Sequence, residues 1–244
     1  MADDSAERVE LSLSIAESMS AVDRAGWNAL ANPPGERYDP FLDWDFLEAA
    51  ESSGCAQPDT GWTPRHMLAH DAAGKLVGAA PLYLKTHSRG EFVFDHSWAD
   101  ALHRAGGRYY PKLLCAVPFT PVTGRRLLAT GPNAPAIRQA MAGAIVEVAQ
   151  QWRVSSAHFN FLEEQEWQAL GLQELLLRED QQFHWLNRGY GSFEDFLGAL
   201  SSRKRKMLRR ERREAERRAA DADWRARLPA EQRAAAKQQS PARP

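Results

Sequence analysis

The chain has 244 residues, of which 43% are hydrophobic and 26% charged, as is ordinary for a soluble globular protein with a sizeable core. Its first ten residues are acidic and polar, which argues against a signal or transit peptide. The most apolar helical stretch, 140–149, is short and interrupted by Glu147, so no membrane span is expected. Cys55 and Cys115 lack CxxC or metal-ligand spacing, and we expect a reducing, cytoplasmic location.

The net charge of −1 hides a strong asymmetry along the chain. Residues 203–218 carry ten Lys or Arg and three Glu, a net charge of +7, and residues 219–244 carry +2. Residues 1–202 are therefore at −10. An acidic body is joined to a basic segment that has the composition of a helix.

The first half of the chain alternates between helical and extended patterns. Residues 1–10 are predicted to be disordered. Apolar alternation predicts a strand, then two helices, then a hairpin closed by the turn Asp71–Gly74, and a short strand before Asp95. The ranges are a strand at 11–15, a helix capped by Ser20 that runs through Leu30, a helix at 41–52, strands at 65–70 and 75–84, and a strand at 91–94.

The second half continues in the same mixed manner. Residues 95–128 are too mixed in character for one helix or strand, and we interpret them as a long packed loop at the mouth of a cleft. The later ranges are strands at 113–117 and 126–129, a helix at 134–152, a strand at 155–161, a helix at 163–170, strands at 172–177 and 182–187, a helix at 193–200 capped by Ser192, and the basic helix 203–218. This order favours an α/β domain with a mixed sheet over residues 11–190, a helical basic segment at 191–218 and a loose tail at 219–244.

The stretch 95–128 concentrates the residue types that chemistry requires. His96 and Asp100 are candidate catalytic acid or base residues. The candidate substrate-binding residues combine aromatic walls with anion-holding cations: Trp98, Arg104, Arg108, Tyr109, Tyr110, Lys112 and Arg125. The alternative is a packed connector whose aromatic side chains fill space and whose charges pair locally, which contributes little at a surface.

Several kinds of site are not indicated. The seven histidines are scattered and form no HxxxH or HExxH motif, so no metal site is expected. A GxSxG elbow, a GxGxxG loop and a Walker A loop are all missing from the sequence. These observations argue against a covalent nucleophile and against classical nucleotide chemistry.

The basic run offers a second candidate site. Arg203, Lys204, Arg205 and Lys206 could hold the phosphates of a nucleic acid or of a phosphorylated substrate. The run lacks interleaved aromatic residues and any base-reading motif, so a solvated charged helix is the alternative.

Three segments resemble a known family. They are SWADALHRAGGRYYPKL, PFTPVTGRRLL and QFHWLNRGYGSFEDFLGALSSRKRKMLRRER, and they resemble the bacterial FemAB-like proteins of the GNAT superfamily, described as peptidoglycan biosynthesis or recognition proteins. The resemblance covers about residues 10–218. It implies a GNAT-like mixed β-sheet flanked by helices, and an N-acyltransferase with no tightly bound cofactor. Acyl-CoA or aminoacyl-tRNA would be the co-substrate, and an amine, as on a cell-wall precursor, would be the acceptor.

Such a reaction needs oriented substrates, a base for the amine and donors for the oxyanion, and no covalent nucleophile. Within such a reaction, the residue chemistry of this stretch favours His96 or Asp100 as the proton acceptor. Arg104, Arg108 and Lys112 become anion holders, with the two tyrosines as substrate walls.

The sequence departs from the family pattern at two places. The pyrophosphate loop of typical GNAT enzymes is missing, and Thr123–Arg126 is only a remote substitute. Family members resemble two tandem GNAT-like halves, whereas this chain ends shortly after the basic helix that would open the second. We therefore expect a truncated form, and the alternative function is a non-catalytic module that binds an anionic ligand or a nucleic acid such as tRNA.

Overall fold

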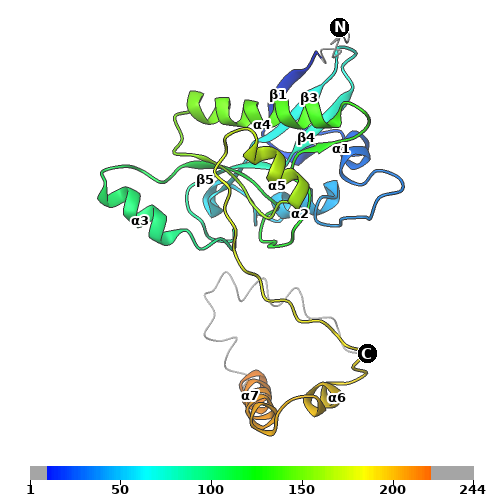
Figure 1. Ribbon diagram of the computed structural model, residues 1–244, viewed down its shortest axis with the longest axis vertical. Helices are drawn as coiled ribbons and strands as arrows, with labels where there is room; N and C mark the ends of the chain where they lie inside the picture. The colour runs from blue at the N-terminus through cyan, green and yellow to red at the C-terminus, as the bar shows by residue number, and fades with distance from the viewer. Residues whose placement is uncertain (1–9, 221–244) are drawn as a thin grey trace. The chain divides into compact units, whose positions relative to one another are not determined.

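The computed structural model describes residues 10–220. They belong to two compact units, which divide after Glu179 (Figure 1). The disorder predicted for the N-terminus and most of the predicted loose tail lie outside the described residues.

Two four-stranded sheets form the centre of the first unit. In the first sheet all pairs are antiparallel, in the order β1 (Ser12–Ala16), β3 (His66–His70), β4 (Leu76–Ala80) and β7 (Leu128–Ala129). The second has the order β2 (Trp62–Pro64), β5 (Leu82–Lys85), β6 (Lys112–Cys115) and β8 (Ala157–Phe159). Because β6 and β8 run parallel while the other pairs are antiparallel, the mixed pairing expected from the sequence is confirmed.

The hairpin predicted over 65–84 contributes to both sheets. Its second strand breaks at Pro81, between β4 and β5. A proline has no N–H to donate to a ladder, so it favours such an interruption. The carbonyl of Pro81 accepts a hydrogen bond from the Ala116 backbone N–H, which ties the break to the end of β6.

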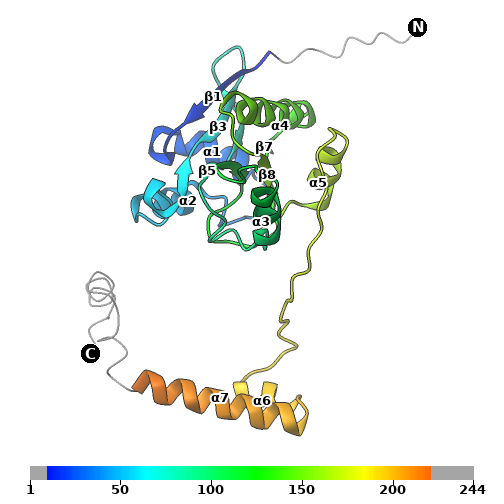
Figure 2. The ribbon, with the colours of Figure 1, turned by 90° about the vertical axis from the view of Figure 1, so that its left-hand side faces the viewer.

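Helices cover both faces of the sheets (Figures 1 and 2). The long helix predicted over 134–152 is present as α4 (Ala134–Gln151), and α1 (Arg24–Ala31) and α2 (Trp44–Ser52) pack on the other side. One core includes Met67, Ala69, Leu82, Leu113, Ile137, Met141 and Ile145. The other core includes Trp27, Leu30, Leu42, Leu47, Leu68 and Leu128.

The first helices begin later than the sequence suggested. Asp23, and not Ser20, caps α1, because its carboxylate accepts from the N–H groups of Ala25 and Gly26. Asp43 likewise caps α2 through the N–H of Asp45. Two short 3-10 turns, Met19–Ala21 and Pro58–Thr60, complete this region.

Part of the secondary-structure prediction was wrong. Residues 95–128 are not one long loop, because they contain α3 (His96–Arg104), which was not predicted, whereas β6 and β7 overlap the strands predicted at 113–117 and 126–129. The short strand at 91–94 and the strand pair at 172–177 and 182–187 do not form. The chain leaves α5 (Glu164–Gly171) where the first strand of that pair was expected. Leu172 and Leu176 are exposed, so no burial of apolar surface offsets the conformational entropy that a strand would lose.

The second unit contains the two predicted C-terminal helices. Ser192 caps α6 (Phe193–Gly198) by accepting from the N–H of Asp195, as expected, and the basic helix is α7 (Ser202–Ala220). Arg205 joins the two helices by donating to the carbonyls of Leu197, Gly198 and Leu200. No helix within residues 10–220 is long and apolar enough to span a bilayer.

Candidate functional site

A fully buried lysine, Lys112, organises the centre of the first unit. It is the first residue of β6, and its Nζ donates to Asp95 Oδ2 at 2.7 Å, to Glu91 Oε2 at 2.9 Å and to Ser88 Oγ at 3.0 Å. All three partners come from the loop between β5 and α3, so one ammonium group fastens that loop to the sheet. We refer to Lys85, Ser88, Glu91, Asp95 and Lys112 as the buried lysine cluster.

The second lysine of the cluster has fewer partners. The Nζ of Lys85 lies 4.0 Å from Glu91 Oε1, 3.4 Å from the Arg89 carbonyl oxygen and 3.5 Å from the centroid of the Trp62 ring. Burial lowers the pKa of Lys85 to about 7, against the attraction of Glu91. Burial also raises the pKa of Glu91, although Lys112 opposes this.

The carboxylate of Asp95 is the best-paired anion of the cluster. Burial would raise its pKa, but the hydrogen bond and charge of Lys112, with further bonds from Ser88 and Tyr109, lower it overall. Asp95 therefore stays ionised, with its Oδ2 engaged by three donors.

Two adjacent tyrosines form a partly exposed rim over this cluster. Tyr109 Oη donates to Asp95 Oδ2 at 2.9 Å, and Tyr110 Oη hydrogen-bonds Ser88 Oγ at 2.8 Å. The two rings meet edge to face with centroids 5.0 Å apart. Burial and the Asp95 hydrogen bond raise the pKa of Tyr109, so its phenol is protonated at neutral pH.

A histidine from the neighbouring strand completes the rim. His158 lies on β8 opposite Leu114, its ring centroid is 6.0 Å from that of Tyr109, and its Nε2 is 2.9 Å from Ser156 Oγ. Burial, assisted by the charge of Lys112, lowers the pKa of His158 to about 4. The imidazole is therefore neutral at pH 7 and can accept one hydrogen bond while donating another.

This arrangement presents neutral polar and aromatic groups to solvent above an ion-paired floor. Lys112 has no exposed surface, so it can position Tyr109 and the loop without touching a ligand.

The structure separates the other predicted residues from this cluster. His96, Trp98, Asp100 and Arg104 are exposed on α3, and Arg108 is exposed just beyond it. Within residues 10–220 no hydrogen bond or ion pair links these side chains to the buried lysine cluster. They are close to the rim in sequence and are exposed on α3 or just after it.

Arg125, a predicted substrate-binding residue, is held by protein oxygens. It donates to the carbonyl of Ala31 at the end of α1 and pairs with Glu36 at 2.9 Å. The C-terminal end of a helix favours a cation, because the helix dipole is negative there. Its neighbour Arg126 is buried and donates to the carbonyls of Val122, Arg125 and Asn160. The turn Thr123–Arg126 thus directs neither guanidinium toward a pyrophosphate.

The four predicted anion-binding residues differ in their exposure and in their partners. Arg203, Lys204 and Lys206 are exposed on α7, whereas Arg205 is occupied by the carbonyls that end α6.

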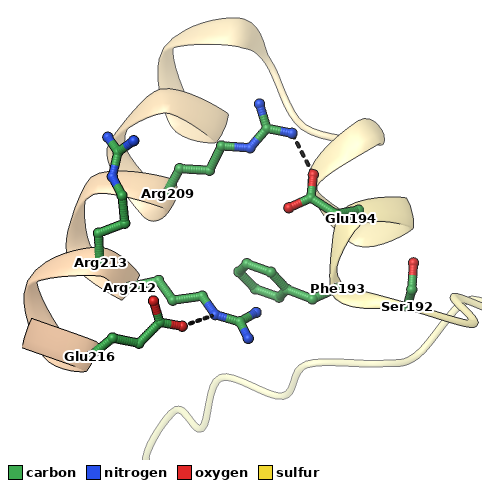
Figure 3. Close-up of a pocket in the computed structure, with 7 residues that line it drawn as sticks. All are labelled: Ser192, Phe193, Glu194, Arg209, Arg212, Arg213 and Glu216. Atoms are coloured by element: carbon green, nitrogen blue, oxygen red, sulfur yellow. Dashed lines mark hydrogen bonds and ion pairs between the residues drawn. The ribbon is translucent and has the colours of Figure 1, made fainter. Parts of the chain in front are cut away.

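A hollow of about 530 Å³ lies farther along α7, between it and the start of α6 (Figure 3). Arg209 pairs with Glu194, and Arg212 pairs with Glu216 while its Cζ lies 4.4 Å from the Phe193 ring centroid. Ser192 and Arg213 complete the lining. Among the described residues Arg213 has no ion pair, unlike Arg209 and Arg212, so of the three arginines that line the hollow it is the one most open to an anion.

The sequence reasoning did not single out Lys85, Ser88, Glu91 or His158. A signal existed in LYLK, where a lysine ends an apolar strand only six residues before a glutamate. A charged residue on an expected core face needs a buried partner. For His158 the signal was its place inside a strand predicted to be buried.

The buried cysteine is poorly suited to act as a nucleophile. Cys115 is fully buried and burial raises the pKa of its thiol, so the thiolate that would act as a nucleophile is not populated. Within residues 10–220 no three His, Cys, Asp or Glu side chains converge as a metal site.

A protein-family model matches most of the chain. The model FemAB_like, described as peptidoglycan biosynthesis/recognition, matches residues 18–235 and so includes the buried lysine cluster and α7. No curated protein matches the chain.

Several solved structures are loosely similar. An acetyltransferase from Trypanosoma brucei is 13% identical with a TM-score of 0.40, over 72% of this chain and 100% of that one. A ribosomal-protein-alanine N-acetyltransferase from Brucella melitensis gives 12% and 0.38, over 73% and 99%. An aminoglycoside 6'-N-acetyltransferase from Acinetobacter baumannii gives 11% and 0.40, over 75% and 100%. At these values neither activity nor substrate follows from the likeness.

Proposed function

Because the chain belongs to the FemAB-like family, we propose that it transfers an acyl or aminoacyl group to an amine on a cell-wall precursor. The observation that carries the proposal is the family match over residues 18–235, whose description concerns peptidoglycan. The donor would be acyl-CoA or aminoacyl-tRNA, used as a co-substrate and not as a bound cofactor.

Direct transfer is the mechanism that these residues favour. The amine attacks the acyl carbonyl, the carbonyl oxygen becomes an oxyanion, and the leaving group departs as the amine loses a proton. Because the Cys115 thiol is buried and protonated, we do not expect an acyl-enzyme intermediate on that residue. Catalysis would come from orientation and from hydrogen-bond donors near the oxyanion.

The proposed proton acceptor is His96 or Asp100. They are four residues apart on α3, so they share a helix face, and both are exposed to an incoming amine. His158 is a weaker choice because a base with a pKa of about 4 takes up little proton at pH 7. It serves better as a neutral hydrogen-bonding group for the acceptor.

The remaining roles follow from how exposed or buried each side chain is. Tyr109 and Tyr110 act as walls of the acceptor site, and Lys112 positions them from below through Asp95 and Ser88. Trp98, Arg104 and Arg108 contact the donor or the acceptor from the α3 side.

The test is an assay of the full chain with each donor class. Acetyl-CoA and alanyl-tRNA are supplied separately with a lysine-containing muropeptide precursor, and mass spectrometry detects the acylated amine. Tyr109→Phe should lower the turnover, because it removes the bond to Asp95. Tyr38→Phe is the matched control, since Tyr38 also donates to a carboxylate, Asp43, at 2.9 Å but far along the chain.

One result would contradict the proposed activity, and another would contradict only the role of the tyrosines. Absence of product with both donors contradicts the transfer activity. Equal turnover by Tyr109→Phe and Tyr38→Phe would remove the tyrosine rim from the site but leave the activity standing.

The hollow on α7 favours a second candidate function, a module that binds phosphate-bearing ligands such as tRNA. Arg213 has no ion pair among the described residues and stands beside Arg209, Arg212 and the Phe193 ring. Fluorescence anisotropy with labelled tRNA would show binding that weakens steeply with salt. Arg213→Ala should reduce it, whereas Arg188→Ala, another exposed arginine of the second unit, should not.

A further inference from the structure

The segment that enters α3 exposes an unusual number of large apolar side chains. Phe92 is 52% exposed, Phe94 76%, Trp98 55% and Leu102 38%, and α3 contains no buried residue. Phe94, Trp98 and Leu102 are spaced by four residues, which places the two helical members on one face and Phe94 just before it. Solvent-exposed apolar residues gathered in this way mark an interaction surface.

The loop that carries Phe92 and Phe94 is anchored by buried ion pairs. Glu91 and Asp95 bracket Phe92 and Phe94, and Lys112 binds both carboxylates. Phe92 has a φ of 56°, in the left-handed region that a bulky residue rarely adopts. A fold that strains its backbone and still leaves the ring in solvent is not explained by core packing. In Figure 1, α3 stands at the outer edge of the first unit, away from the sheets.

The charges around this surface are mainly positive. Arg104 ends α3, Arg108 follows four residues later, and the Arg178 guanidinium lies 5.3 Å from the Trp98 ring centroid. The carboxylates of Glu91 and Asp95 are neutralised inside the protein by Lys112, which leaves Asp100 as the exposed acid of the helix. Trp98 and Asp100 are two residues apart, so their side chains point to opposite sides of α3, and Arg104, four residues after Asp100, lies on the same side as Asp100.

We propose that α3 and the preceding loop dock on an anionic lipid surface. Phe92, Phe94, Trp98 and Leu102 enter the acyl boundary. Arg104 and Arg108 reach the phosphate headgroups with their long side chains. Tryptophan and phenylalanine flanked by arginine are the composition of an interfacial helix, and each cation adds attraction to an anionic leaflet. The proposal does not rest on the transfer activity, and it assigns Trp98, Arg104 and Arg108 to the lipid surface in place of the substrate contacts considered above.

Vesicle flotation of the full chain tests this directly. The protein should float with vesicles of about 30% phosphatidylglycerol in phosphatidylcholine and should remain in the bottom fraction with phosphatidylcholine alone. This difference is expected because an interfacial helix with flanking arginines binds more strongly to anionic lipid. The double variant Phe94→Ser/Trp98→Ser should lower the bound fraction roughly tenfold. Trp152→Ser is the matched control, because Trp152 is 40% exposed at the end of α4 and should bind as the unmodified chain does.

A second readout locates the contact. Leu102→Cys in a Cys55→Ser background carries an environment-sensitive fluorophore, and Cys115 is buried and should not react. Its emission should shift to the blue on adding the anionic vesicles. Circular dichroism and thermal melting of each variant confirm that the fold is intact.

Three outcomes would overturn the proposal. One is no flotation with anionic vesicles. Another is flotation that survives Phe94→Ser/Trp98→Ser but is lost in Arg203→Ala/Lys204→Ala/Lys206→Ala, which would assign the attraction to α7. The third is a dimer in sedimentation velocity that the α3 variant abolishes, because the apolar surface would then be covered by a second copy.

Discussion

Lys85 and Lys112 lie directly opposite each other on the antiparallel strands β5 and β6, and neither has any exposed surface. Two like charges at such a pair position are unfavourable on their own. The loop between β5 and α3 supplies Glu91 and Asp95, and these two carboxylates compensate the two lysines. The ion pairs therefore bind the loop, the rim tyrosines and the base of α3 into one structure.

Replacing Lys112 by Met should destabilise the protein by about 3–5 kcal/mol, because Glu91 and Asp95 would remain buried without their cation. Urea denaturation measures the free energy of unfolding. Arg24→Met is the control, since it breaks an exposed ion pair with Asp45 that contributes about 0–1 kcal/mol. Equal losses in the two variants would mean that the cluster is not a structural anchor.

The stability should depend on pH through Lys85. Its pKa is lowered to about 7 in the folded state, while an unfolded lysine titrates near 10.4. Between these two pH values the unfolded chain binds more protons than the folded protein. The contribution of Lys85 to the free energy of unfolding therefore increases as the pH rises from 7 to 10. The slope approaches about 1.4 kcal/mol per pH unit.

Lys85→Met should remove that slope, and Lys75→Met, at an exposed turn position, should retain it. Denaturation series at pH 7, 8 and 9, inside the window of roughly two to three pH units, measure the difference. Parallel curves for all three proteins would disprove the assigned shift.

His158 should remain neutral down to acidic pH. Its pKa is lowered to about 4, below the usual value near 6.5, so the unfolded state takes up the proton first as the pH falls between these values. This group therefore destabilises the fold progressively from pH 6.5 to 4. NMR titration of the imidazole Cε1–H, assigned with His158→Gln, should show little change above pH 5. A midpoint near 6.5 would contradict the burial of the ring.

Two glycines should respond to alanine with opposite signs. At Gly78 on β4 a Cβ would lie 2.7 Å from both Ile137 Cγ2 and Met141 Sδ, so α4 would have to move. We expect Gly78→Ala to cost about 1–3 kcal/mol. Gly143, inside α4, has open space around the position of a Cβ, and Gly143→Ala should stabilise by roughly 0.5–1 kcal/mol. Thermal denaturation of both variants compares them, and a stable Gly78→Ala would show that the packing there is loose.

The site was only half visible in the sequence. The chemistry-rich stretch drew attention to Tyr109, Tyr110 and Lys112, which the structure brings together. It also suggested His96 and Asp100, which stand apart on α3. The partners Ser88, Glu91 and His158 come from other elements, and no local pattern states which side chain will face Lys112. The roles assigned to all of these residues remain predictions.

By itself the sequence determined the family, the mixed α/β class, the long helix α4, the Ser192 cap and the basic helix α7. These depend on local periodicity, on capping and on motif, which act over a few residues. Only the tertiary structure decided that β4 and β5 belong to different sheets and that Lys85 faces Lys112. It alone also decided that the Arg125 side chain donates to the carbonyl of Ala31 at the C-terminal end of α1. Strand register and buried ion pairing join residues far apart in the chain, and their energies depend on which groups are desolvated together.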